Sequence, residues 1–174
     1  LTGVRTTYVV TLISKFGEES APCLPSAPVI RWDMVAGANA GGEVYVALPA
    51  APAGYVATKK RIYRAESSGV FQFVADVTAD TVSFVDSVLS EKMGVALPST
   101  EWDMPDARLQ GLTAMPGGFL AGFFDNTLCF SEAYYPHAWP VSYQLAFADD
   151  IVGIAVVANG IVVTTKGQPH LVTG

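Results

Sequence analysis

Few residues of this chain have the types and spacing that acid–base or metal chemistry needs. Asp149 and Asp150 are adjacent, and adjacent side chains of a strand point to opposite faces, so in a strand the two carboxylates could not flank one glycosidic bond. In a loop that objection weakens, and a solvated turn is then the simpler interpretation. His137 and His170 are the only histidines and belong to no HExxH or HxxxH motif, so the ligand spacing of a zinc site is absent.

Signals for a nucleophile or a nucleotide site are equally weak. Ser131 has no Gly-x-Ser-x-Gly elbow around it, and Cys129 lies in the alternating segment TLCFS, which favours a packed thiol. Cys23 and Cys129 are the only cysteines and form no CxxC pair, so two buried thiols are the simpler interpretation and a disulfide stays open. No GxxxxGKS or GxGxxG loop occurs. We therefore predict a protein that is not an enzyme, with no catalytic residues, no cofactor and no metal site.

One loop is dense in flat side chains and is stiffened by Pro136 and Pro140. We call it the aromatic loop; its residues of interest are Tyr134, Tyr135, His137, Trp139 and Tyr143. Aromatic rings stack on sugars, and Trp and Tyr anchor protein interfaces. Three interpretations follow. The loop folds over its own sheet and fills the core, packs against a neighbouring subunit, or forms a glycan platform.

Four of the ten basic residues fall in one short stretch, which we call the basic strip: Lys59, Lys60, Arg61 and Arg64. A solvated strand face is the simplest interpretation, and an interface with an acidic neighbour is the sharper one. The rest of the chain is acidic, with a net charge of −6. A DNA-binding protein needs a broad basic face, so we predict no tight binding of nucleic acid.

The composition describes a folded protein with an unusually uncharged surface. Hydrophobic residues make up 51% of the chain and charged residues 15%, where a free-standing soluble domain averages roughly 25% charged residues. The deficit indicates surface that is buried against other subunits or against further chain. No apolar run approaches the roughly 18 residues of a membrane helix, so we predict no membrane span.

The pattern of hydrophobic residues predicts strands, because helical periodicity is nearly absent. Breaker-free or alternating segments rich in β-formers predict strands at residues 5–14, 43–48, 58–65, 70–77 and 81–85. Residues 36–42 read as a loop and residues 86–105 as a connection. From residue 109 the strands become tighter and the turns read PGG, DN, ANG and KGQ, which suit short hairpins. We therefore predict an all-β chain with regions 1–105 and 106–174.

The last third contains an internal echo. Residues 111–132 and 153–174 align without a gap at an offset of 42 residues, with Gly111 on Gly153 and Gly118 on Gly160. Each copy reads as strand, tight turn, strand, tight turn, strand. A period of about 40–45 residues with several short strands is typical of propeller blades, so we predict part of a propeller-like module there.

Three stretches of the first half resemble fibronectin type III modules. Residues 8–22 resemble the last two strands of such a module, residues 60–77 its middle hairpin, and residues 82–88 the next strand and its aspartate. The resemblance implies a β-sandwich over residues 1–105. The final-strand motif comes first in the chain, which leaves two alternatives. Residues 1–22 either close a preceding module or complete the sheets of the downstream one.

The second half resembles virion proteins of short-tailed phages related to the tail tubular, or nozzle, protein. The resemblance is carried by Pro116-Gly117-Gly118, by FSE at residues 130–132, by PHAWP at residues 136–140, and by residues 151–153 and 164–174. It implies a propeller-like module in a ring at the end of the DNA channel, assembled in the bacterial host cytoplasm and located in the virion.

Together these patterns predict a non-enzymatic structural component of a phage or prophage tail, acting through interfaces with other copies of itself and with neighbouring virion proteins. The alternative is a carbohydrate-binding or adhesin module of a larger secreted protein, because fibronectin-like modules often accompany secreted enzymes. A propeller hydrolase whose acidic residues lie outside this sequence is a third alternative.

Overall fold

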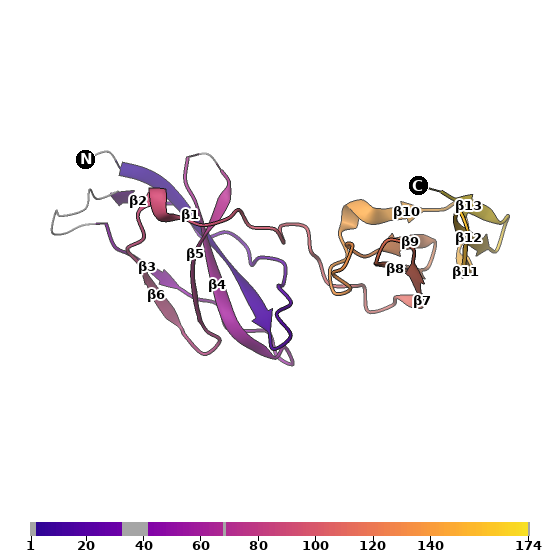
Figure 1. The fold of residues 1–174 in the computed structure, drawn as a ribbon, viewed down its shortest axis with the longest axis horizontal. Coiled ribbons are helices and arrows are strands. Elements are labelled where there is room, and N and C mark those ends of the chain that lie inside the picture. Colours follow the sequence, from indigo (N-terminus) through magenta and orange to yellow (C-terminus); the bar gives the residue numbers. More distant parts are fainter. Residues whose placement is uncertain (1–2, 33–41, 68, 174) are drawn as a thin grey trace. The chain divides into compact units, whose positions relative to one another are not determined.

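The computed structural model describes residues 3–32, 42–67 and 69–173, and the regular secondary structure there is almost entirely β-strand (Figure 1). Across these described residues every strand pair is antiparallel and no sheet is closed. Within the described residues the helical segments are two single 3-10 turns, η1 (Ser90–Lys92) and η2 (Val141–Tyr143). The predicted all-β class is therefore confirmed. Of the loop predicted at residues 36–42, residues 36–41 lie outside the described residues.

The chain divides into two compact units, Leu1–Thr100 and Glu101–Gly174, which we call the first and second units. The division falls a few residues before the boundary that the sequence suggested at residue 105. Residues of the intervening segment bond within the second unit. The Trp139 amide donates to the Asp103 carbonyl oxygen at 2.9 Å, and the Trp102 ring lies 4.4 Å from the Tyr135 ring.

The first unit contains a four-stranded sheet in the order β2-β1-β4-β5 and a separate pair, β3-β6. The strands are β1 (Gly3–Ser14), β2 (Val29–Trp32), β3 (Val44–Ala47), β4 (Ala57–Ala65), β5 (Phe71–Thr78) and β6 (Ser83–Asp86). β1 pairs with β4 through eight residue pairs from Thr7 to Ser14. The segment that the sequence left between two modules is therefore a central strand of this unit's own sheet.

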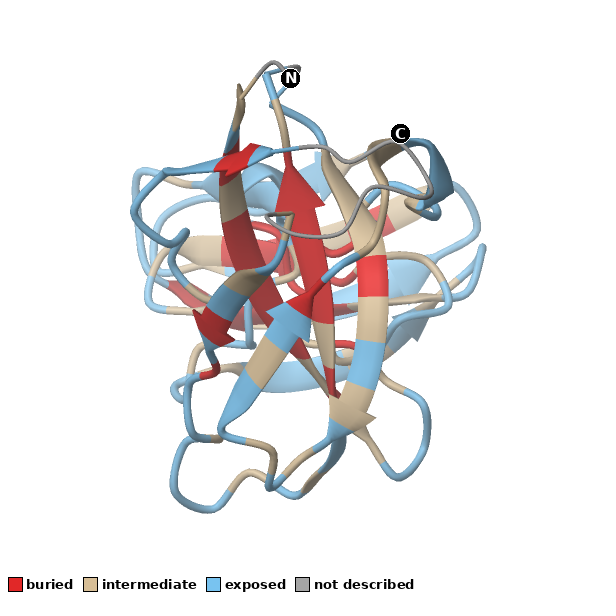
Figure 2. Ribbon diagram, turned by 90° about the vertical axis from the view of Figure 1, so that its left-hand side faces the viewer, coloured by how far each residue is buried: buried red, intermediate tan, exposed pale blue. Residues whose placement is uncertain are grey.

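Apolar side chains from both sheets of the first unit meet in one core. Its buried members are Tyr8, Val10, Val46, Leu48, Ile62 and Val74. They come from β1, β4 and β5 on one side and from β3 and its exit on the other. This two-layer arrangement follows from the period of two along each strand, which places alternate residues on one face. Figure 2 shows the buried residues along the central strands.

A proline-containing segment completes the free edge of β1. The backbone amides of Ser20, Cys23 and Ser26 donate to carbonyl oxygens of β1, each at 2.9 Å. In return the side chains of the same three residues accept hydrogen bonds from β1 amides, at 2.9, 3.2 and 3.0 Å. The period of three is that of a polyproline II segment. Pro22 and Pro25 fall between the bonding positions, where a missing N–H costs nothing.

The second unit consists of two antiparallel meanders. The first has the order β10-β9-β8-β7, and the second the order β11-β12-β13. The strands are β7 (Gln110–Met115), β8 (Phe119–Phe124), β9 (Thr127–Phe130), β10 (Gln144–Ala146), β11 (Ile151–Val157), β12 (Gly160–Thr165) and β13 (His170–Val172). Their facing side chains form one core made of Ala121, Phe123, Leu128, Ile151, Ile161 and Val163.

The internal echo holds in the order of strands but not in their registers. β7-β8-β9 and β11-β12-β13 are both three consecutive antiparallel strands. The first turn has three residues in one copy (116–118) and two in the other (158–159), and the second turn has two (125–126) and four (166–169). The gapless alignment at an offset of 42 residues therefore does not reproduce the strand registers, because the turns differ in length. Polar, glycine-rich turns tolerate such changes because their backbone lies at the surface.

Candidate functional site

The basic strip is not a solvated face, so that interpretation was wrong for two of its four residues. Lys60 and Arg64 are only 2% and 0% exposed. The Lys60 ammonium donates to the Thr81 carbonyl oxygen at 2.7 Å. Arg64 donates to the Asp86 carboxylate at 2.6 Å and to the Val88 carbonyl oxygen at 2.8 Å. Both cations are thus bonded inside the first unit and are not offered to a partner.

The other two residues of the basic strip differ from each other. Lys59 is exposed. Arg61, on the face of β4 opposite Lys60, forms ion pairs with Asp76 at 2.7 Å and with Glu19 at 3.1 Å. Those carboxylates hold the pKa of Arg61 above its usual range, with the Asp76 hydrogen bond as the largest cause. Three residues of the strip therefore serve internal contacts, and Lys59 alone of the four is exposed.

Asp86 is the partner that sequence reasoning did not identify. It is fully buried, and its carboxylate accepts hydrogen bonds from the Tyr8 hydroxyl at 2.7 Å, from Arg64, and from the Val88 amide at 2.9 Å. Buried Arg31 lies 4.0 Å from the same carboxylate. Burial and the hydrogen bond to Asp86 raise the pKa of Tyr8 well above its ordinary value. These charged groups are buried away from solvent, so we assign them a role in stabilising the fold of the first unit.

The aromatic loop is divided between core and surface. Trp139 is 4% exposed, and its indole N–H donates to the Pro136 carbonyl oxygen at 3.0 Å. Its inclusion in an open platform was therefore wrong, since the ring fills the interior of its own unit. Tyr134 is 79% exposed and has a positive φ of 64°. Its ring lies so close to Gly118 that a Cβ there would overlap it.

A stacked group of rings stands at the surface beside the buried tryptophan. Tyr135 lies 4.4 Å from Trp102 between ring centroids, with an angle of 34° between the planes. His137 lies edge-on to Trp102 at 5.8 Å and to Tyr135 at 6.1 Å. Trp102 is a functional candidate that sequence reasoning missed, because it lies 33 positions before Tyr135 in a stretch read as a connection.

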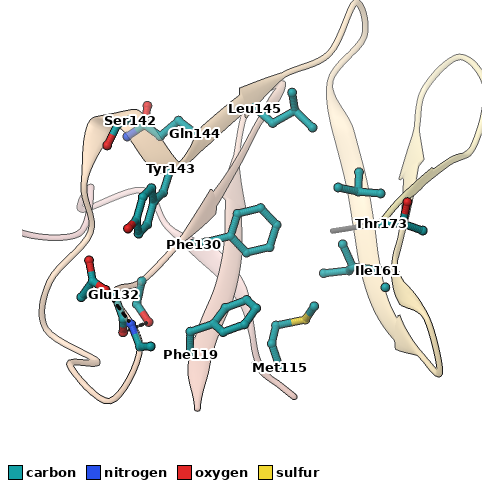
Figure 3. Close-up of a pocket in the computed structure, with 14 residues that line it drawn as sticks. Met115, Phe119, Phe130, Glu132, Ser142, Tyr143, Gln144, Leu145, Ile161 and Thr173 are labelled. Carbon is teal, nitrogen blue, oxygen red and sulfur yellow. Dashed lines mark hydrogen bonds between the residues drawn. The ribbon is translucent and has the colours of Figure 1, made fainter. Parts of the chain in front are cut away.

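A concavity of the second unit lies between its two sheets (Figure 3). It has a volume of about 520 Å³. Its apolar walls are formed by Met115, Phe119, Phe130, Leu145, Ile161 and Val172. Phe119 and Phe130 meet edge to face at 5.9 Å. We call this concavity the hollow.

The hollow is a continuation of the core of the second unit. Ala121 and Leu128 fill the space between the sheets farther in, and both are fully buried. Phe130 pairs with Ala121 and Leu145 pairs with Leu128 across the strands. Directly opposed residues of antiparallel strands share a face, so Phe130 and Leu145 extend the same apolar face to the point where no second layer covers it. Leu145 is consequently exposed although it belongs to that face.

One end of the hollow is polar and negatively charged. Glu132 and Tyr143 line this end together with Ser131, Ser142 and Gln144 (Figure 3). The pKa of Tyr143 is raised, with the negative charge of Glu132 as the largest cause, and Glu101 contributes in the same direction. Among the described residues no Lys or Arg forms an ion pair with Glu132 or Glu101. Of the aromatic loop, Tyr143 is the residue that lines the hollow.

The remaining reactive side chains are dispersed. Both cysteines are free thiols, and burial raises the pKa of Cys129 to about 11. Asp149 and Asp150 lie in the exposed bend before β11, where Lys166 pairs with Asp150 at 2.8 Å. His170 packs on Phe147 with ring centroids 5.0 Å apart. In the described part of the chain no three His, Cys, Asp or Glu side chains are grouped as metal ligands would be.

The hollow is suited to binding. It combines an apolar trough of the size of ligand pockets with a carboxylate at one end. Within residues 3–32, 42–67 and 69–173 no helix is long and apolar enough to cross a bilayer. The sequence matches no protein-family model and no curated protein.

Proposed function

We propose that this protein is a structural subunit that works by assembling with other copies and other proteins, as a component of a phage or prophage tail. The observation that carries the proposal is the hollow. It is the exposed extension of an apolar core, and apolar concavities edged by a few polar groups are where ligands and partner side chains usually bind. A half-exposed Leu145 and the rings of Phe119 and Phe130 would gain from burial against a partner.

The arrangement of the two sheets in the second unit supports a propeller-like module. Two successive meanders pack face to face through the core that contains Ile151, Ile161 and Phe123. Successive blades of a propeller stack in the same way around an axis. The first unit has two layers, and its Ser20–Ser26 segment bonds along the free edge of β1. This arrangement supports a fibronectin-like sandwich. We propose these identities for the two units.

The residues that carry the phage resemblance also build the hollow. Phe130, Ser131 and Glu132, the FSE motif, line it directly. Trp139 of the PHAWP motif anchors the following loop, because its indole and amide groups are both bonded inside the unit. The Ala138 carbonyl oxygen accepts the Glu132 amide at 2.8 Å, which ties the two motifs together. This coincidence favours an assembly role for the segment.

The experiment is the assembly state of the protein, measured by light scattering and followed by negative-stain imaging. Closed rings or other assemblies of fixed size are expected. Mass spectrometry of purified virions or induced prophage particles supplies the second readout. A protein that stays monomeric at the high local concentration of an assembling particle, and that is absent from particles, would refute the proposal.

The stacked rings of Trp102 and Tyr135 favour a second candidate, a carbohydrate-binding module. Exposed rings bind sugars by stacking, and Tyr135 is exposed beside its partner. The informative variant on a glycan array is Tyr135→Ala. Trp139→Ala is unsuitable, because truncation of a buried Trp costs roughly 3–5 kcal/mol of stability and would remove binding by unfolding. No glycan binding by the wild type would exclude this candidate, and binding that survives Tyr135→Ala would exclude these rings as the platform.

A further inference from the structure

The hollow has a definite chemical preference. Its trough is apolar, and its far end carries Glu132, with Glu101 close enough to act on Tyr143. In the described part of the chain no internal cation neutralises these two carboxylates by an ion pair. A complementary occupant therefore presents a large apolar side chain next to a positive charge. The volume of about 520 Å³ admits a few residues of an extended or turned segment.

The first unit displays one segment with that chemistry. The most exposed large hydrophobic side chains of the described residues, at 73% or more, are Phe16, Leu24, Tyr45, Val56, Val82, Val95, Met104 and Tyr134. Of these, Phe16 is the one that has a basic residue beside it in the chain, namely Lys15. Phe16 is 77% exposed, and Lys15 is also exposed.

The Lys15–Phe16 turn is held in a fixed shape. The Gly17 amide donates to the Ser14 carbonyl oxygen at 3.0 Å, and Gly17 has a φ of +83°, which favours glycine. The Ser14 hydroxyl accepts the Phe16 amide at 3.1 Å and donates to the Glu18 carboxylate at 2.8 Å. The Lys15 ammonium lies 4.9 Å from the centroid of the Phe16 ring. Little conformational entropy is lost when a turn of this kind docks.

We propose that the Lys15–Phe16 turn of one copy docks into the hollow of a second copy, with the Phe16 ring between the sheets and the Lys15 ammonium at Glu132. The inference rests on the proposed function, because it names the surfaces through which copies assemble. Two different surfaces meet, so the contact is head to tail. Such a contact closes into a ring or extends into a filament, depending on the rotation between subunits.

The test uses the full chain and two variants that are each defective on one surface. Phe16→Ser removes the ring, and Glu132→Lys reverses the charge in the hollow. Each variant alone is expected to self-associate about tenfold or more weakly than the wild type, as for a central interface residue. An equimolar mixture is expected to form one-to-one dimers and nothing larger. One intact turn then meets one intact hollow, and both remaining surfaces are defective. Sedimentation velocity measures the wild type, each variant alone and the mixture.

Matched controls separate docking from folding. Tyr45→Ser removes an equally exposed ring of the first unit, and Glu91→Lys makes the same charge change at a side chain that is 73% exposed. Both are expected to assemble like the wild type. Thr173→Arg places a cation in the hollow at an exposed position and is expected to reproduce Glu132→Lys. Circular dichroism confirms that each variant is folded.

The outcomes distinguish this inference from the proposed function. If Phe16→Ser, Glu132→Lys and Thr173→Arg self-associate as strongly as the wild type, the docking of the turn is overturned. The proposed structural role is not affected by that result. Monomeric variants that do not form dimers when mixed also overturn it. A wild type that is monomeric at all concentrations overturns the docking of the turn, and its absence from purified particles then overturns the proposed function as well. One-to-one dimers in the mixture alone support the head-to-tail contact.

Discussion

Removal of the Asp86 carboxylate is expected to destabilise the first unit severely. Asp86 has no exposed surface and accepts hydrogen bonds from Tyr8, Arg64 and Val88 at 2.6 to 2.9 Å. In Asp86→Ala the Arg64 guanidinium, also fully buried, loses its nearest anion. An uncompensated buried charge of this kind costs about 3–5 kcal/mol. Glu66 lies 3.1 Å from Arg64 and offsets part of this, so we expect the lower end of the range, about 3 kcal/mol.

Hydrogen exchange measured by mass spectrometry is the appropriate assay, since two units need not unfold in one transition. A loss of about 3 kcal/mol accelerates exchange of the protected amides of β1 and β4 by roughly a hundredfold. Asp76→Ala is the matched control. It removes the carboxylate that pairs with Arg61, which lies on β4 like Arg64, but these two side chains are 30% and 27% exposed. A surface pair of this kind is worth about 1 kcal/mol or less.

A third variant separates charge from shape. Asp86→Asn keeps the size of the side chain and one carbonyl acceptor but removes the negative charge, so most of the destabilisation is expected to persist. If Asp86→Ala exchanges as slowly as Asp76→Ala, the buried ion pair does not contribute as argued. If Asp86→Asn behaves like the wild type, the hydrogen bonds and not the charge stabilise the unit.

Three further predictions concern pH, thiol chemistry and backbone space. Burial and Asp86 hold the pKa of Tyr8 above that of a free tyrosine. The stabilisation that the protonated Tyr8 hydroxyl contributes is therefore complete below about pH 10, the pKa of an unfolded tyrosine, and is lost as the pH rises above it. Alkaline denaturation curves should show this loss of stability in the wild type and a smaller loss in Tyr8→Phe. The Cys129 thiol, with its pKa raised to about 11, should react with iodoacetamide more slowly than half-buried Cys23 in native protein at pH 8, and equal labelling by peptide mass spectrometry would contradict its packing. Gly160→Ala should destabilise the β12–β13 hairpin, because a Cβ there overlaps the Val172 carbonyl oxygen at a φ of +151°, whereas Gly153→Ala meets only the Thr164 hydroxyl at 3.5 Å; equal melting temperatures of the two variants would refute this.

Strand positions were largely predictable from local pattern. The predicted segments 5–14, 43–48, 58–65 and 70–77 coincide with β1, β3, β4 and β5 to within two residues. These strands are short runs of β-formers between prolines and glycines, and such signals depend on neighbours in sequence. The register of the echo was not predictable in the same way. Turns of different length preserve the order of strands while they change which residues face each other.

The sites were less predictable, because burial depends on partners distant in sequence. The basic strip was placed on the surface since lysine and arginine are rarely buried without a partner. The partner of Arg64 is Asp86, 22 positions later, and that of Lys60 is the Thr81 carbonyl oxygen, 21 positions later. In the aromatic loop the flat side chains were recognised as a group. Their division into buried Trp139, stacked Tyr135 and Tyr143 at the hollow follows from packing.

The sequence by itself determined that the chain is all-β, where its hairpins turn, and which loop concentrates aromatic side chains. Each of these depends on backbone preferences and on alternation over a few residues. Only the tertiary structure decided that Lys60 and Arg64 are internal, that Trp102 joins Tyr135, and that Phe119, Phe130 and Leu145 line a hollow with Glu132 at its end. These contacts join residues that are tens of positions apart in the chain. Contacts over such sequence separations produce no periodic pattern that a reading of the sequence could detect.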